Sequence, residues 1–124
     1  MSETAAALAF AVDLLSGMGP VAARRMFGGA GLYAGQVMFG LVDDDVIYLK
    51  VDEALKADMV AAGSQSWIYS GRKDAGPMET SYWSLPDAAL DDPEEACDWG
   101  RRALAVAERL KAAKPVRKKR SPRA

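Results

Sequence analysis

Two segments in the first half of the chain carry apolar residues at the spacing of an amphipathic α-helix. The first spans residues 5–16 and follows Thr4, a residue type favoured at the N-cap of a helix. The second spans about residues 53–62 and follows Asp52, which favours the same position. The side chains predicted to face the core from these two helices are those of Leu8, Ala11, Val12, Leu15, Leu55, Met59 and Ala62.

A third helix is the most clearly signalled element. Asp92 precedes Pro93, and two acidic residues follow in the turn where the helix dipole is positive. The helix is predicted to run to residue 114 and to end at Pro115, because an internal proline removes a backbone hydrogen bond. Its predicted core-facing side chains are Ala96, Trp99, Ala103, Val106 and Leu110.

Between the helices the pattern changes to short runs rich in β-branched and aromatic residues. The run 21–27 fits a strand, although its Ala-Ala-Arg-Arg segment would also tolerate a helical turn. The turns at 34–36 and 43–45 are too short for anything but antiparallel neighbours. The other strands are predicted at residues 31–33, 37–42, 46–51, 67–69 and 80–85.

This order of elements indicates an α+β fold. We expect a two-layer domain in which a mainly antiparallel meander of five to six strands is flanked by an N-terminal, a middle and a long C-terminal helix. The domain is predicted to occupy residues 1–114, followed by a basic, disordered tail at 115–124. The pattern does not decide the order of the strands, and an exposed edge strand would allow a homodimer.

The composition agrees with one globular domain, since the chain has 124 residues and half of them are hydrophobic. No apolar run approaches the roughly 20 residues that cross a bilayer, and the N-terminus lacks the basic start of a signal peptide. The single cysteine, Cys97, suits a reducing compartment. We therefore expect a cytoplasmic protein without a membrane partner.

The chain contains no histidine, which excludes the Ser-His-Asp and Cys-His nucleophile systems and the commonest transition-metal ligand. The remaining chemical candidates are Lys50 as a desolvated nucleophile, Cys97 as a reactive thiol and residues 43–45, Asp-Asp-Asp, as a Mg²⁺ or Ca²⁺ site. An ordinary structural role is favoured for each of them. We therefore expect no enzyme, no catalytic or metal-binding residues and no cofactor.

Glycines recur in the stretch RRMFGGAGLYAGQVMFGLV, Arg24 to Val42. A phosphate-binding loop would lead into a helix whose N-terminus binds the anion, but strand residues Leu32 and Tyr33 follow here. These glycines are therefore predicted to be joints and close-packing positions of a bent sheet. The structural glycines are Gly28, Gly29, Gly31 and Gly35.

Aromatic residues are frequent in the predicted strands. They could stack nucleic-acid bases, but residues 1–110 hold 9 basic against 17 acidic residues, a balance of −8 that repels phosphates. Packing in the core and at a protein interface is the favoured role. The predicted partner-binding residues are Arg24, Arg25, Phe27, Tyr69, Tyr82 and Trp83.

The last segment has the opposite charge. Residues 111–124 carry 7 basic residues and no acidic one. Such a segment could make weak contacts with DNA or RNA phosphates without sequence preference, or it could simply be a solvated terminus. The candidate nucleic-acid-binding residues are Lys114, Arg117, Lys118, Lys119, Arg120 and Arg123.

The run RRMFGGAGLYAGQVMFGLVDDDVIYLKVDE, with the later AAGS, SYWSLP and DDPEEACDWGRRAL, resembles the TfoX N-terminal domain family of TfoX/Sxy-type competence regulators. The resemblance covers roughly residues 15–110. The family's two-domain regulators carry a further helical domain, so it implies a stand-alone N-terminal domain here. It also implies a protein partner in the transcription machinery, such as the cyclic-AMP receptor protein, with which those regulators act as co-activators.

These observations favour a non-enzymatic protein-interaction or regulatory module that resembles part of the transcriptional co-activators of competence. One alternative is a non-specific nucleic-acid-binding protein that acts through the basic tail. The other is an enzyme of unknown type, which would need a pocket with paired carboxylates or a Lys50 with a perturbed pKa.

Overall fold

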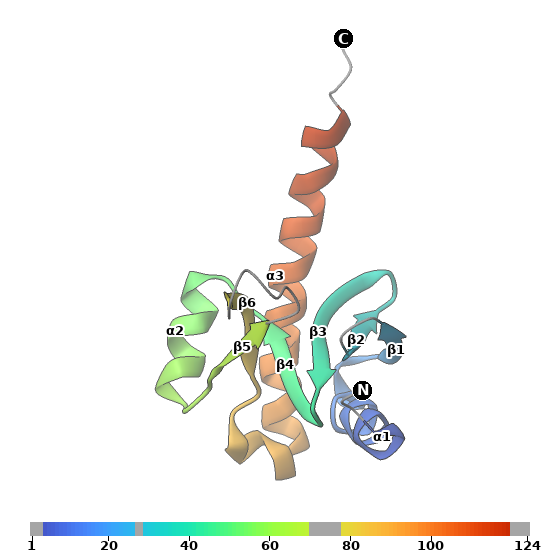
Figure 1. Cartoon of the computed structure of the whole chain (residues 1–124), viewed down its shortest axis with the longest axis vertical. Helices are drawn as coiled ribbons and strands as arrows, with labels where there is room; N and C mark the ends of the chain where they lie inside the picture. Colours follow the sequence, from blue (N-terminus) through green and yellow to red (C-terminus); the bar gives the residue numbers. More distant parts are fainter. Residues whose placement is uncertain (1–3, 27–28, 70–77, 120–124) are drawn as a thin grey trace.

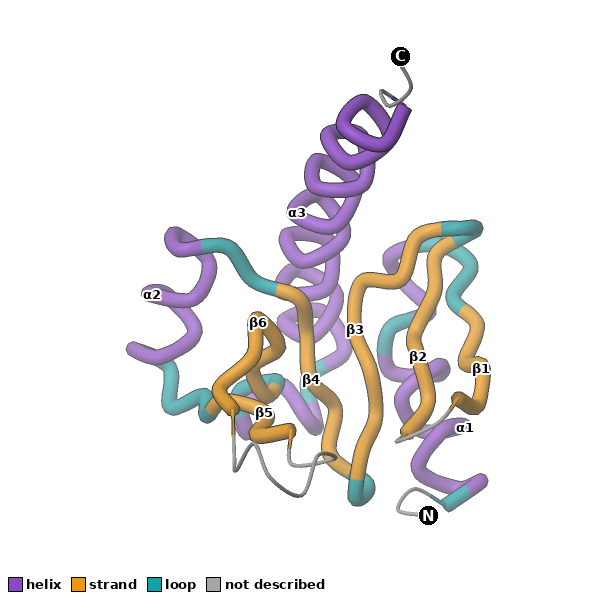
Figure 2. The backbone as a smooth tube through the Cα atoms, turned by 45° about the horizontal axis from the view of Figure 1, so that its top comes forward, coloured by secondary structure: helices purple, strands orange, loops and turns teal. Residues whose placement is uncertain are grey.

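The fold is described by a computed structural model that covers residues 4–26, 29–69 and 78–119. It confirms the α+β class with a six-stranded antiparallel sheet and three α-helices. The strands are β1 Ala22–Met26, β2 Gly29–Ala34, β3 Val37–Asp43, β4 Val46–Lys50, β5 Ser66–Tyr69 and β6 Met78–Ser84. Their order in the sheet is β1-β2-β3-β4-β6-β5, so the last strand in the sequence is inserted beside β4 (Figure 2).

The α-helices begin at the predicted caps. The Thr4 hydroxyl accepts a hydrogen bond from the backbone N–H of Ala7 at 3.1 Å, and the Asp52 carboxylate accepts one from Leu55 at 2.9 Å. Asp92 caps the third helix in the same way. The helices are α1 Ala5–Leu14, α2 Glu53–Ala61 and α3 Pro93–Lys119, with the short 3-10 helices η1 Ser16–Met18 and η2 Asp87–Asp91.

The C-terminal helix is longer than predicted. α3 continues past Pro115 to Lys119, so the predicted helix end at residue 114 is wrong. The disorder expected for the tail stays a prediction. A proline removes only its own N–H donor and strains one turn, while most residues on either side of it here are strong helix formers. The end of α3 extends well beyond the sheet (Figure 1). Residues 120–124 lie outside the described part of the chain.

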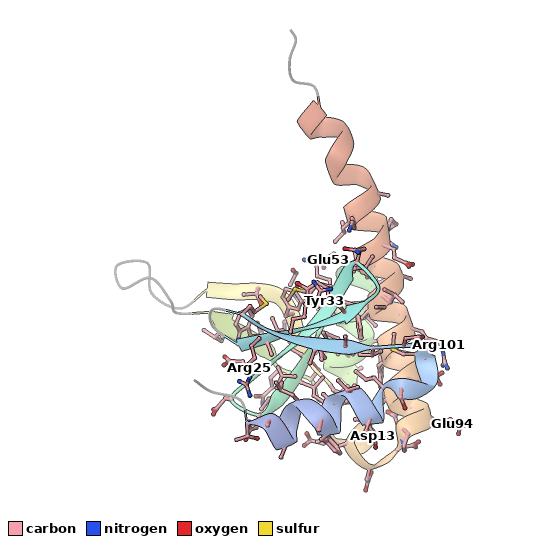
Figure 3. All side chains as sticks on the ribbon, turned by 90° about the vertical axis from the view of Figure 1, so that its right-hand side faces the viewer. Asp13, Arg25, Tyr33, Glu53, Glu94 and Arg101 are labelled. Carbon is pink, nitrogen blue, oxygen red and sulfur yellow. The ribbon has the colours of Figure 1, made fainter. Side chains whose placement is uncertain are left out.

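The helices cover one face of the sheet. α3 passes behind β3 and β4 in Figure 1, and the side view in Figure 3 shows α3 along one side of the sheet with α1 running beneath the strands. Ion pairs from α3 to α2 tie these two helices together, one from Arg102 to Asp58 at 2.7 Å and one from Arg109 to Asp52. No described helix lies over the opposite face of the sheet.

The core lies between the helices and the sheet, and a β-bulge places its largest side chain there. Leu32 of β2 pairs with Gly40, and the next residue, Tyr33, pairs with Met38, so Phe39 has no partner of its own. The Phe39 side chain is completely buried. The core around it includes Leu14, Leu15, Leu32, Val42, Leu49, Leu55, Met59, Ala96, Ala103 and Val106.

Two residues predicted to face the core are exposed instead. Ala62 is the C-cap of α2, and Leu110 lies on α3 with 42% of its surface exposed. The 3-10 helix η2 has no counterpart among the predicted elements. Among the described helices, none is both long and apolar enough to cross a membrane.

Asp52 is expected to make the stability of the domain depend on pH. The backbone N–H of Leu55, and next the guanidinium of Arg109, hold the pKa of Asp52 below its usual range. Because the folded pKa is the lower one, the stabilisation is complete above about pH 4 and is lost as the pH falls through the folded value. Asp52→Ala is expected to lower the free energy of unfolding by about 1 kcal/mol at neutral pH.

Urea unfolding of both proteins from neutral pH down to about pH 2 measures this difference, which should shrink below about pH 4. Glu53→Ala is the control, because Glu53 is an exposed acidic neighbour whose side chain is not the cap. If the difference in unfolding free energy between Asp52→Ala and the unaltered protein stayed constant across the acidic range, the stabilising role of the ionised Asp52 carboxylate would be contradicted.

Candidate functional site

The strand register decides which side chains reach the face without helices. Leu32 and Leu49 are buried against the helices, so their chain neighbours on β2 and β4 point to the other side of the sheet. Cross-strand partners share a side, which extends the assignment from strand to strand. We name this side the open face; its side chains are those of Arg24, Met26, Tyr33, Met38, Leu41, Tyr48, Lys50, Trp67 and Tyr82.

Three aromatic rings pack against one another on the open face. The ring centroids of Tyr48 and Trp67 are 6.2 Å apart, and Trp67 meets Tyr82 edge-on at 6.1 Å. Trp67 is also held by hydrogen bonds, since its Nε1 donates to Asp43 Oδ2 at 2.9 Å and its carbonyl accepts from the Thr80 hydroxyl at 2.9 Å. The three rings therefore form a fixed and partly exposed surface, which we name the aromatic platform.

Two cations lie over rings of the open face. The guanidinium carbon of Arg24 is 4.6 Å from the centroid of the Tyr33 ring, and the Lys50 ammonium is 5.0 Å from that of Tyr82. The same ammonium donates a hydrogen bond to Ser81 Oγ at 2.7 Å. Stacking on a ring face orients a cation. The Lys50 ammonium therefore lies over a ring of the aromatic platform, and the Arg24 guanidinium lies over the Tyr33 ring on the same face.

Gly31 makes room for the Tyr33 ring. A Cβ atom at position 31 would lie 2.8 Å from Tyr33 Cε1, and 3.1 and 3.2 Å from the sulfur atoms of Met26 and Met38. The missing side chain therefore lets one ring and two thioethers cover this part of the sheet. Methionine side chains adapt readily to the shape of a partner.

The phenols of the open face are neutral hydrogen-bonding groups. Burial raises the pKa of Tyr82, and the nearby Tyr33 raises it further. Burial also raises the pKa of Tyr48, followed by the charges of Asp43 and Asp44. Both hydroxyls therefore stay protonated at physiological pH, where they can donate and accept hydrogen bonds with a partner.

The structure divides the residues predicted to bind a partner. Arg24 and Tyr82 lie on the open face. Their chain neighbours Arg25 and Trp83 point to the helix side, because strand side chains alternate. Figure 3 shows Arg25 on the side of α1, and Trp83 packs against the core with the Lys56 ammonium 5.2 Å from its ring centroid. Arg25 and Trp83 therefore lie on the other side of the sheet from Arg24 and Tyr82, and their role in partner binding stays a prediction.

Other predicted residues cannot be placed. Their positions, or their side chains alone, lie outside the described part of the chain. These residues are Phe27, Gly28, Tyr69, Lys114, Arg117, Lys118, Lys119, Arg120 and Arg123.

Seven members of the open face were not among the predicted partner-binding residues, and four of these seven are aromatic or charged: Tyr33, Tyr48, Lys50 and Trp67. Tyr33 and Tyr48 each adjoin a core leucine on their strand, so strict alternation could have indicated them. Lys50 follows from the same alternation on β4. Trp67 could not have been found in this way, because its place depends on β5 pairing with β6 at the edge of the sheet.

The glycine-rich stretch leads into a strand and not into a helix, since β2 begins at Gly29. Gly35 lies in the turn between β2 and β3 with φ +62°, a conformation that favours glycine. Asp44 and Asp45 form the next tight turn, and the described residues include no group of three that could hold a metal ion. Cys97 is buried, and its Sγ donates to a carbonyl at the end of α1 at 3.5 Å, unlike a reactive surface thiol.

Comparison with known proteins matches residues 13–107 to the TfoX N-terminal domain. The match starts within α1, includes all six strands and ends in α3, so it contains the whole open face. No protein of curated function matches the chain. Because the match extends over most of the 124 residues, the chain belongs to the TfoX N-terminal domain family.

Proposed function

We propose that the protein is a non-enzymatic regulatory domain whose open face binds an acidic segment of a protein partner. The observation that carries this proposal is the aromatic platform of Tyr48, Trp67 and Tyr82, with the ring-stacked cations Arg24 and Lys50 on the same face. Aromatic and arginine side chains are the usual anchors of protein interfaces. The two cations would select a partner segment that carries carboxylates.

Family membership supports a regulatory role for this interaction. TfoX-type regulators act as co-activators with the cyclic-AMP receptor protein at competence promoters, so a transcription factor of that kind is the partner class we propose. Residues 1–110 carry a balance of −8, which disfavours direct contact of the body with DNA phosphates. Binding to a protein on the DNA avoids that repulsion.

Two double variants with the same change of charge test the surface. Arg24→Glu with Lys50→Glu reverses both cations of the open face, whereas Arg25→Glu with Lys56→Glu reverses one arginine and one lysine on the helix side. We expect the first pair to weaken binding to purified cyclic-AMP receptor protein at least about tenfold, because each reversed charge repels an acidic segment. The second pair should bind like the unaltered protein.

Binding is measured by titration at two salt concentrations, and circular dichroism checks that both variants are folded. Affinity capture from the native cell with the same variants identifies the partner if it is a different transcription factor. Equal losses for both variants would exclude the open face as the contact surface. Failure of the unaltered protein to bind any transcription protein would reject the regulatory interaction itself.

A second candidate function, nucleic-acid binding, is favoured by the length of α3. Lys111 still contacts the body through a hydrogen bond to the carbonyl of Gln36, but the helix carries residues 112–119 beyond the sheet, which reduces the repulsion that phosphates would otherwise meet (Figure 1). If this segment binds DNA or RNA, affinity should fall steeply with salt and disappear when the chain is truncated at Pro115. Binding that is insensitive to salt, or that survives truncation, would reject this function.

A further inference from the structure

A hollow at one end of the sheet forms a second candidate binding site. It lies where the turn between β3 and β4 meets α1 and η2, and it encloses about 330 Å³. The buried side chains of Ile47 and Leu85 form part of its lining. The other apolar and aromatic residues that line it are Ala7, Phe10, Val46, Tyr48 and Leu90. We name this hollow the end pocket. Its volume is at the lower limit of pockets that enclose small ligands.

The end pocket is bordered by large apolar side chains that the fold leaves exposed. Phe10 is 46% exposed, Val46 39% and Leu90 38%, and they come from α1, β4 and η2. They are three of the seven large apolar side chains that are exposed in the described part of the chain. Single exposed apolar residues are common, but several around one cavity are typical of a binding site.

The charge around the end pocket is negative. Asp45 and Asp87 line it, and none of the described residues that line it is basic. Asp45 is held in place because its Oδ1 accepts a hydrogen bond from the backbone N–H of Thr4 at 2.8 Å. The pocket therefore combines an apolar lining with two carboxylates, a combination that favours an apolar group next to a cation.

We propose that the end pocket binds a protein segment in which a large apolar side chain adjoins a lysine or an arginine. The apolar side chain would fill the cavity, and the neighbouring cation would pair with Asp45 and Asp87. The exposed rim argues for a peptide over a small ligand, because Phe10 and Leu90 offer apolar surface outside the cavity. The end pocket shares Tyr48 with the aromatic platform, but its two carboxylates give it the opposite charge preference to the cations of the open face.

Two matched peptides test the proposal. The first is a blocked hexapeptide, Gly-Lys-Phe-Leu-Lys-Gly, and the second carries glutamates in place of the two lysines. We expect the lysine peptide to cause saturable chemical-shift changes in the NMR spectrum at residues 45–48 and 84–90. The glutamate peptide should bind at least about tenfold more weakly, because its charges repel both carboxylates.

Two variants of η2 distinguish binding at the end pocket from attraction of the peptide by the overall negative charge of the domain. Asp87→Lys is expected to weaken the lysine peptide about tenfold, whereas Asp91→Lys should leave its affinity unchanged. Both residues are exposed in the same short helix, but Asp91 does not line the pocket. Equal effects of the two variants, equal affinities of the two peptides, shifts at other residues, or no binding at millimolar peptide would each overturn the proposal.

Discussion

Replacing Phe39 by alanine is expected to lower the free energy of unfolding by about 4 kcal/mol, which makes it the most damaging substitution considered. Phe39 is the largest completely buried side chain in the described part of the protein, and the bulge in β3 places it in the core. The sheet and the helices around it are held by their own backbone hydrogen bonds, so they cannot close the cavity that alanine leaves. Small domains have only about 5–15 kcal/mol of stability in total.

Urea unfolding measures this loss: the midpoint urea concentration should fall, while the dependence of the unfolding free energy on urea concentration should stay unchanged. Phe10→Ala is the matched control, because the same atoms are removed from a side chain that is 46% exposed, and its cost should stay within about 0.5 kcal/mol. Phe39→Leu keeps most of the volume and should cost about 1 kcal/mol. Similar losses for Phe39→Ala and Phe10→Ala would contradict the placement of Phe39 at the centre of the core.

The elements that were predicted well are those whose signals are local. Thr4, Asp52 and Asp92 each satisfy a backbone N–H three residues ahead, so the caps could be identified without knowledge of the fold. The tight turns at 34–36 and 43–45 likewise imposed antiparallel neighbours. The class and the order of elements followed from these local rules.

The order of the strands in the sheet could not be predicted, because it depends on contacts between distant segments. β6 pairs with β4 as well as with β5. β5 therefore lies at the edge of the sheet, although it precedes β6 in the sequence. The bulge at Phe39 is equally hidden, since a regular strand and a bulged strand show similar hydrophobic patterns.

The members of the open face could be identified only in part from the sequence, because their placement also depends on contacts between distant segments. Strand side chains alternate, so an error of one position moves a residue to the other face. Arg24 and Tyr82 belong to the open face, while their neighbours Arg25 and Trp83 do not. Composition indicated aromatic and basic residue types, but the choice between adjacent residues required knowledge of which face the helices cover.

Gly40→Ala is expected to cost about 2 kcal/mol of unfolding free energy, the second largest loss. A Cβ atom at position 40 would lie 2.6 Å from the backbone oxygen of Tyr48, so the pairing of β3 with β4 at the centre of the sheet would have to shift. Gly31→Ala is the informative comparison, because the nearest atoms there belong to side chains, with Tyr33 Cε1 at 2.8 Å.

The Tyr33 ring and the neighbouring methionine side chains can rotate away from a new Cβ atom, whereas a backbone oxygen in the middle of the sheet cannot. Gly31→Ala is therefore expected to cost less stability than Gly40→Ala, although both add one methyl group to an interior strand. Because the displaced Tyr33 ring carries the Arg24 guanidinium, Gly31→Ala should also weaken partner binding at the open face. Urea unfolding ranks the two stabilities, and a larger loss for Gly31→Ala would show that the thioethers and the ring are as rigid as the backbone.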